Sequence, residues 1–200
     1  MVDEDFSRIR GYNGSQMTPT KPELKFTYED YLLLPEDKQY ELIDGDLYMI
    51  PAPRPYHQIV AGQIGVALHL FVDERGLGKI IHAPCDIYFS RYDVVQPDIL
   101  FIKSERLGII KETNIQGPPD LVIEIISPSN PRKDRELKRT VYARYGVREY
   151  WIVDPDAKSI EVLTRQEGDL KLHQTFVADD SLTSPLLEGF RLSLPAAFKF

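Results

Sequence analysis

The chain has 200 residues, 42% of them hydrophobic and 28% charged, which suits one compact domain with a normal buried core. This composition excludes an intrinsically disordered chain and a mini-scaffold that depends on disulfides or structural metals. The single cysteine, Cys85, cannot form an internal disulfide, and no secretory leader or apolar run of membrane-spanning length is visible. We therefore expect a cytoplasmic protein without a membrane segment.

The distribution of charge is uneven. The formal net charge of −7 argues against a protein that coats nucleic acid through bulk positive charge. Residues 132–148 nevertheless carry seven basic and two acidic side chains, so the rest of the chain is strongly acidic. Such a basic segment is either a solvated helix face or a surface that faces phosphate groups, and the charges alone leave both interpretations open.

Two helices and four strands are predicted in the N-terminal half. A threonine suited to N-capping opens a short helix over residues 27–34, and a proline follows it. Asp44-Gly45, between two short apolar runs, predicts a β-hairpin because both turn positions favour positive φ angles. Apolar residues at helical spacing predict a long helix over residues 56–74. Residues 79–89 and 96–102 are then expected to be two strands joined by a turn.

The C-terminal half is predicted to begin with a buried strand. Residues 121–126 are apolar except for one glutamate, as expected for a strand covered on both faces. Capping residues and a proline over 127–131 predict a helix start, and Tyr145-Gly146 predicts its end, so the basic segment should be helical. Further strands are predicted at residues 149–154, 159–164 and 171–176. The leucines and phenylalanine after residue 184 are expected to dock on the body.

These elements predict one α/β domain over residues 26–200. Its core would be a mixed β-sheet flanked by helices, with an added N-terminal hairpin and added C-terminal strands. Residues 1–25 mix charge, Gly, Asn, Ser and Pro without periodicity, so we expect them to form a flexible tail.

Three charged side chains stand out from their surroundings. Glu124 interrupts the apolar strand, where a buried carboxylate is unfavourable unless a cation or hydrogen bonds compensate it. Asp98 begins another apolar strand, and Lys138 lies on the basic helix that follows Glu124. Singly, they can be explained as an ion-paired glutamate, a turn cap and a solvated lysine. Together they suit a Mg²⁺ site with two carboxylates, beside an ammonium that assists reaction at a phosphate.

Several blocks of residues occur in a specific order over roughly residues 27–195. They are Tyr40-Glu41-Leu42-Ile43-Asp44-Gly45, His57, Gln96-Pro97-Asp98-Ile99, Pro119 to Ser129, Lys138, Tyr142 and Gly146 to Pro155. In this order they resemble the PD-(D/E)XK nuclease superfamily and, within it, the bacterial Uma-two family of restriction endonucleases. The resemblance implies a restriction-endonuclease-like core.

The resemblance also implies roles for the charged residues. Asp98 and Glu124 would be the first and second acids of the nuclease motif. The superfamily's simplest pattern has a lysine two residues after the glutamate, where this chain has Ile126. In the Uma-type branch the lysine lies on the following helix, which points to Lys138, with Lys133 as a substitute.

Two further candidates follow from the same resemblance. Glu41 is either a third metal ligand or an exposed residue beside the hairpin. His57 contacts phosphate, positions water or caps the long helix. On the basic helix, possible DNA contacts are Lys133, Arg135, Arg139 and Tyr142, although Tyr142 is equally well explained as a core aromatic residue.

We therefore expect an endonuclease that uses Mg²⁺, or Mn²⁺ as a substitute, for water attack on a DNA phosphodiester. Asp98, Glu124 and Glu41 would hold the metal ion. A homodimer is expected from the nuclease resemblance, because cutting both strands at once needs two sites. The alternative is a catalytically inactive module of the same fold that binds DNA or acts in assembly, and a third reading is a hydrolase of other phosphoesters.

Overall fold

The structure, a computed structural model, describes residues 24–35, 38–126 and 133–200, the last range with side chains from residue 136 onward. Its centre is a six-stranded sheet in the order β11-β10-β9-β8-β6-β3. β8 and β9 are parallel, and the other neighbours are antiparallel. The strands are β3 (Gly78–His82), β6 (Ile99–Lys103), β8 (Leu121–Ile125), β9 (Glu149–Asp154), β10 (Ser159–Gln166) and β11 (Asp169–Val177).

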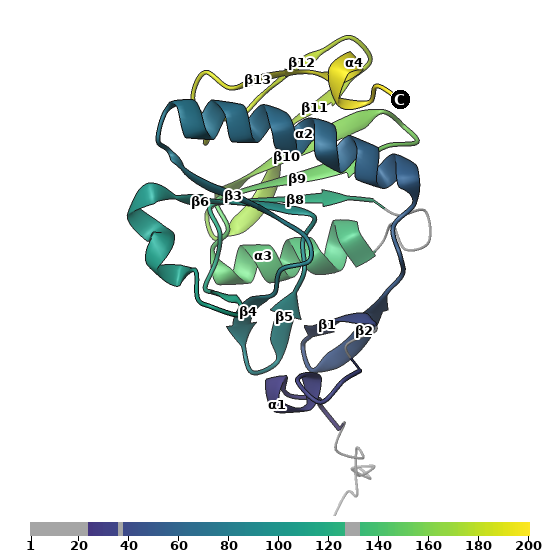
Figure 1. Cartoon of the computed structure of the whole chain (residues 1–200), viewed down its shortest axis with the longest axis vertical. Coiled ribbons are helices and arrows are strands. Elements are labelled where there is room, and N and C mark those ends of the chain that lie inside the picture. Colours follow the sequence, from purple (N-terminus) through teal and green to yellow (C-terminus); the bar gives the residue numbers. More distant parts are fainter. Residues whose placement is uncertain (1–23, 36–37, 127–132) are drawn as a thin grey trace, which may run out of the picture.

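Helices cover both faces of this sheet (Figure 1). α2 (Pro55–Glu74) lies on one face, and α3 (Arg139–Tyr145), preceded by the π-helix η2 (Lys133–Lys138), lies on the other. Side chains of β8 alternate between the two apolar layers, so every residue of this strand is buried. The predicted helix-flanked mixed sheet is confirmed. No helix in the described ranges is long and apolar enough to cross a membrane.

A second, five-stranded sheet lies beyond α3, in the order β2-β1-β5-β4-β7 (Figure 1). The β1–β2 hairpin turns at Asp44 and Gly45, whose φ angles of 51° and 82° confirm the predicted turn. The 3₁₀ helix η1 (Ser104–Ile109) connects β6 toward this sheet. The strands are β1 (Gln39–Ile43), β2 (Asp46–Ile50), β4 (Ile87–Ser90), β5 (Asp93–Val95) and β7 (Ile115–Gln116).

The prediction of a single strand over residues 79–89 is wrong, because this segment forms two strands that belong to different sheets. β3 ends in the central sheet, and β4 begins after a break around Pro84. Pro84 has no N–H to donate to a strand ladder, and the chain leaves the central sheet at this point. The polypeptide after the break carries β4 and β5 before it returns as β6.

The first helix is shorter than predicted. α1 (Tyr28–Tyr31) makes a single turn, whereas the predicted helix extended to residue 34. A capping box between Thr27 and Asp30 stabilises its N-terminus. The predicted helix start over 127–131 lies outside the described residues, as does most of the predicted tail. The predicted helix end is confirmed, because Gly146 follows α3 with a φ of 93°.

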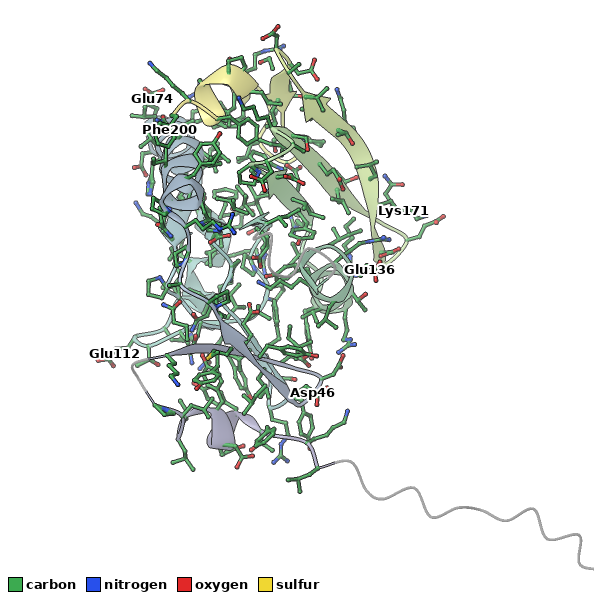
Figure 2. The ribbon with its side chains drawn as sticks, turned by 90° about the vertical axis from the view of Figure 1, so that its right-hand side faces the viewer. Asp46, Glu74, Glu112, Glu136, Lys171 and Phe200 are labelled. Atoms are coloured by element: carbon green, nitrogen blue, oxygen red, sulfur yellow. The ribbon has the colours of Figure 1, made fainter. Side chains whose placement is uncertain are left out.

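The C-terminal segment packs on the α2 side of the sheet. β12 (Ser181–Thr183) pairs with β13 (Arg191–Ser193), and α4 (Leu194–Ala197) follows them near α2 (Figure 1). Leu187, Phe190 and Leu192 are buried in the same cluster as the core side chains of α2, which confirms the predicted docking. Figure 2 shows α2, ending at Glu74, and the β10–β11 pair, near Lys171, on opposite sides of the molecule.

A buried glutamate ties this segment to the sheet. Glu149 Oε1 accepts hydrogen bonds from the Trp151 indole N–H and the Ser184 hydroxyl, each at 2.7 Å. Its Oε2 accepts one from the Leu186 backbone N–H at 2.8 Å. Burial raises the pKa of Glu149, and these three hydrogen bonds oppose that rise. The sequence indicates no such role for Glu149, which stands at the start of β9.

Candidate active site

Two of the three acids predicted to hold metal lie next to each other at the ends of neighbouring strands. Asp98 immediately precedes β6, and Glu124 is on β8, one position beyond the opposed pair Ile99 and Ile123. Residues in such opposed positions present their side chains on the same face of a sheet. The backbone N–H of Ile125 donates to Asp98 Oδ2 at 2.7 Å, which fixes the aspartate against β8.

Lys138 joins Glu124 to a second glutamate from the other sheet. Its Nζ lies 2.9 Å from Glu124 Oε2 and 2.9 Å from Glu41 Oε1 on β1. These three side chains are almost inaccessible, with exposed fractions of 1% for Glu41, 4% for Glu124 and 5% for Lys138. The structure thus brings together three predicted site residues that are far apart in the sequence.

Tyr142 supports Glu124 from inside the protein. It lies one helical turn after Lys138, is fully buried, and donates from its hydroxyl to Glu124 Oε1 at 2.5 Å. Burial, and then the neighbouring carboxylates of Glu124 and Glu41, raise its pKa well above the usual value. The hydroxyl therefore stays protonated and can donate. Complete burial does not favour the predicted contact of Tyr142 with DNA, and supports the core alternative.

His57 lies beside Asp98 at the start of α2. His57 Nε2 lies 3.0 Å from the Ile125 carbonyl oxygen and 3.4 Å from Asp98 Oδ2, near the start of α2. The N-cap of α2 is Arg54, so His57 does not cap the helix.

Gln96, the first residue of the Gln96-Pro97-Asp98-Ile99 block, has a role that the sequence pattern does not indicate. Its backbone N–H donates to Glu41 Oε1 at 3.1 Å. Its side-chain amide donates to Asp86 at 2.6 Å and to the Tyr31 hydroxyl at 3.2 Å, which anchors the turn before Asp98. The signal available in the sequence was the position of this polar residue next to Pro97-Asp98.

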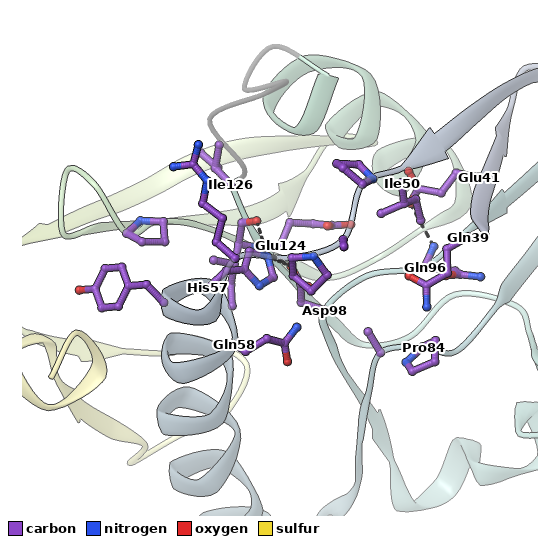
Figure 3. A pocket seen from close by; sticks show the side chains of 18 of the residues that line it. Gln39, Glu41, Ile50, His57, Gln58, Pro84, Gln96, Asp98, Glu124 and Ile126 are labelled. Carbon is purple, nitrogen blue, oxygen red and sulfur yellow. Dashed lines mark hydrogen bonds and ion pairs between the residues drawn. The ribbon is translucent and has the colours of Figure 1, made fainter. Parts of the chain in front are cut away.

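One pocket of about 380 Å³ is lined by the charged and polar residues of the site, namely Glu41, His57, Gln96, Asp98, Glu124 and Lys138 (Figure 3). In the figure, Asp98 and Glu124 lie between His57 on the start of α2 and Glu41 on the β1 side. The pocket therefore presents two acids from the central sheet, one acid from the second sheet and one ammonium. Carboxylates and an ammonium at this spacing can bind a cation and polarise an anionic substrate.

The basic helix makes ion pairs with the acidic body. Arg139 lies 2.8 Å from Asp169, and Arg144 lies 2.6 Å from Asp44. The described arginines of the helix therefore compensate neighbouring carboxylates. This finding favours neither a purely solvated helix face nor a surface that faces phosphate groups. The predicted DNA contacts Lys133 and Arg135 have side chains outside the described residues.

The carboxylates of the pocket are a donor set of the kind that a divalent cation prefers. In the part of the chain that the structure describes, no group of three or more His, Cys, Asp or Glu side chains is arranged around an ion site. Mg²⁺ needs only one or two protein carboxylates, because waters and substrate oxygens complete its coordination. Asp98 and Glu124 supply such a pair from adjacent strands, and each carboxylate oxygen has two acceptor positions. The residues therefore fit a divalent cation held by two carboxylates.

Comparison with known families agrees with the resemblance inferred from the sequence. Residues 28–195 match the model of the Uma2 family, whose description is "Putative restriction endonuclease". The chain belongs to the Uma2 family. This confirms the resemblance inferred from the sequence, and the family description supports a nuclease function in general terms.

One solved structure similar to this Uma2 protein is described as a "putative nuclease belonging to DUF820" from Anabaena variabilis. It shares 21% identity with a TM-score of 0.73, and the match covers 86% of this chain and 97% of that one. At this identity the likeness shows the fold. No curated protein matches the sequence.

Proposed function

We propose that this Uma2 protein is an endonuclease that hydrolyses DNA phosphodiester bonds with Mg²⁺, or with Mn²⁺ in its place. The observation that carries the proposal is the convergence of Asp98, Glu124 and Lys138 on one pocket, in a chain of a family described as restriction endonucleases. A carboxylate pair with an adjacent ammonium is suited to hydrolysis at phosphorus.

Each side chain then has a specific task. Asp98 and Glu124 would hold the cation, with Glu41 as a further carboxylate nearby. When bound, the divalent cation supplies Lewis-acid polarisation of the phosphate and lowers the pKa of a bound water. Lys138 offers positive charge to the negative charge that develops on the phosphate. Tyr142 and His57 are positioning residues, because each contacts a metal-binding carboxylate.

The formal charges support one divalent cation in the site. Glu41, Asp98 and Glu124 contribute three formal negative charges, and Lys138 contributes one positive charge. The remaining two negative charges are equal and opposite to the charge of one Mg²⁺. Without the cation, this negative pocket would repel DNA. We therefore also propose that DNA binding is weak and salt-sensitive until a divalent cation is present. A homodimer remains part of the proposal, since two sites are needed to cut both strands at once.

Replacement of Asp98 by Ala tests the proposal. Asp98→Ala should abolish the conversion of supercoiled plasmid to nicked or linear DNA in Mg²⁺ or Mn²⁺. The matched control is Asp73→Asn on an exposed part of α2 outside the pocket, and it should cleave at the native rate, as measured on agarose gels. An Asp98→Ala protein that cleaves as fast as the native one would refute the assignment.

The same experiment decides the alternative function. An inactive nuclease-fold module would bind DNA equally well in EDTA and after Asp98→Ala, and no protein would cleave. One specific observation favours this alternative. The Lys138 ammonium is paired with one carboxylate oxygen of Glu41 and with one of Glu124. Cation-dependent binding measured by fluorescence anisotropy, together with cleavage, contradicts it.

A further inference from the structure

The pocket in front of Glu124 is larger and more apolar than one phosphate group requires. Its volume of about 380 Å³ lies in the range of pockets that enclose an organic ligand. One wall is formed by residues 49–53, where the chain passes from β2 to α2. Other walls are formed by Ala83, Pro84 and Ile126, and the start of α2 completes the enclosure (Figure 3).

The reacting groups lie at the bottom of this pocket. Glu41, Glu124 and Lys138 are between 1% and 5% exposed and the Asp98 side chain is 18% exposed, so a phosphodiester must enter the pocket to reach all four. In a paired duplex, stacking holds each nucleotide in a stiff rod, and a single phosphate cannot move inward alone. A strand with one unstacked nucleotide can follow the pocket wall inward.

The walls suit a nucleobase. Met49, Ile50 and the nearby proline rings offer apolar surface to the faces of a base, as apolar side chains do in sites that hold an extruded nucleotide. Gln39 and Gln58 line the same pocket, and each amide carries both a hydrogen-bond donor and an acceptor for a base edge. The pocket thus combines a site for the phosphate with a site for the attached base.

We propose that this pocket takes one unstacked nucleotide, so that the substrate is single-stranded DNA or a duplex with a locally unpaired position. This inference rests on the proposed nuclease function, because it names the substrate class of the same site. Pulling a base out of a fully paired duplex costs a few kcal/mol, and this cost is absent or smaller in a single strand or at a mismatch.

Binding is tested without hydrolysis. A single strand with 2-aminopurine, a duplex with 2-aminopurine at a mismatch and a matched duplex with 2-aminopurine opposite thymine are each titrated with the native protein in Ca²⁺, and a gel verifies that each oligonucleotide stays intact. The fluorescence of 2-aminopurine is quenched by stacking, so it should rise on binding when the probe sits at a mismatch or in a single strand. Binding of these two probes, shown by anisotropy, with no rise in fluorescence would overturn the inference.

Cleavage supplies the second test. In Mg²⁺, a single strand and a mismatched duplex should be cut about tenfold faster or more than the matched duplex, given the cost of unstacking. Equal or faster cleavage of the matched duplex would overturn the inference. If no substrate is cut, the proposed nuclease function fails, and the fluorescence experiment still decides whether the pocket takes a nucleotide.

A variant that fills the pocket tests its location. Ala52 is exposed and lines the pocket, so Ala52→Trp should occupy the space for the base and lower single-strand cleavage about tenfold or more by lost base contacts. The matched control is Val66→Trp, on an exposed part of α2 outside the pocket, which should cleave at the native rate. An Ala52→Trp protein with the native rate would overturn the inference.

Discussion

Removal of the Lys138 charge should strongly destabilise the protein when no cation is present. Lys138→Met keeps a side chain of similar length but removes the ammonium that lies 2.9 Å from both Glu41 and Glu124. The two glutamates are 1% and 4% exposed, so water does not replace the lost partner. Breaking a buried ion pair by deleting one partner typically costs about 3–5 kcal/mol, and here two carboxylates lose the same partner. We expect a loss at the upper end of this range in EDTA.

Urea unfolding measures this loss directly. Trp151 is the single tryptophan, is fully buried and reports unfolding by its fluorescence. The matched control is Lys79→Met, because Lys79 is 61% exposed and pairs with Asp73 at 3.7 Å. Such an exposed pair should contribute less than about 1 kcal/mol. Because a divalent cation supplies positive charge to the same carboxylates, Mg²⁺ should restore part of the stability of Lys138→Met and little of that of Lys79→Met.

The reasoning is refuted by a Lys138→Met protein that unfolds in EDTA at nearly the same urea concentration as the native protein. That result would mean that Glu41 and Glu124 do not depend on the ammonium for charge compensation. A large loss that Mg²⁺ does not reduce would retain the ion-pair argument but contradict the assignment of a cation to this carboxylate cluster.

Two further predictions concern packing and buried charge. Gly65→Ala should cost about 1–3 kcal/mol in urea unfolding, because a Cβ on Gly65 would overlap the His82 ring of β3; Gly62→Ala on the same helix meets nothing and should instead be neutral or stabilise by up to about 1 kcal/mol. Glu149→Gln should cost about 1–3 kcal/mol at neutral pH, because its amide NH₂ can face the Leu186 N–H. The pKa of Glu149 is raised above 4.5 by burial, so the folded state binds this proton more tightly, and the contribution of Glu149 to stability falls as pH rises through the raised pKa. Glu149→Gln should lack this decline, and an unchanged pH dependence of unfolding would contradict the argument.

The sequence predicted those parts of the fold that local chemistry determines. The Asp44-Gly45 turn, the long helix α2 and the buried strand β8 each follow from residue type and periodicity within a short window. The split of residues 79–89 between two sheets was missed, because apolar residues continue across Pro84 and a strand's choice of sheet depends on distant partners.

In the candidate site, too, the sequence predicted the residues with a local signal and missed those whose role depends on distant contacts. Glu124 was found from a local anomaly, a carboxylate within an apolar strand, and its compensation by Lys138 agrees with that argument. Gln96 was missed because its contribution is a backbone N–H to Glu41, a contact between segments that are distant in sequence. Burial of Glu149 depends on the C-terminal segment that covers it, and no pattern around residue 149 indicates that cover.

The segregation of charge in the sequence has its explanation in the ion pairs of the folded chain. The segment from 132 to 148 is basic, and the six carboxylates that pair with its described cations all lie elsewhere in the sequence. Lys138 compensates Glu41 and Glu124, and three arginines compensate acids at the ends of strands and turns, namely Arg139 with Asp169, Arg144 with Asp44 and Arg148 with Asp120. These four described cations are paired with carboxylates of the body, so they offer little unpaired positive charge to a DNA backbone. In the pocket, where three carboxylates face one ammonium, a bound cation would supply positive charge for a phosphate, and the proposed function therefore makes that cation a condition for tight DNA binding.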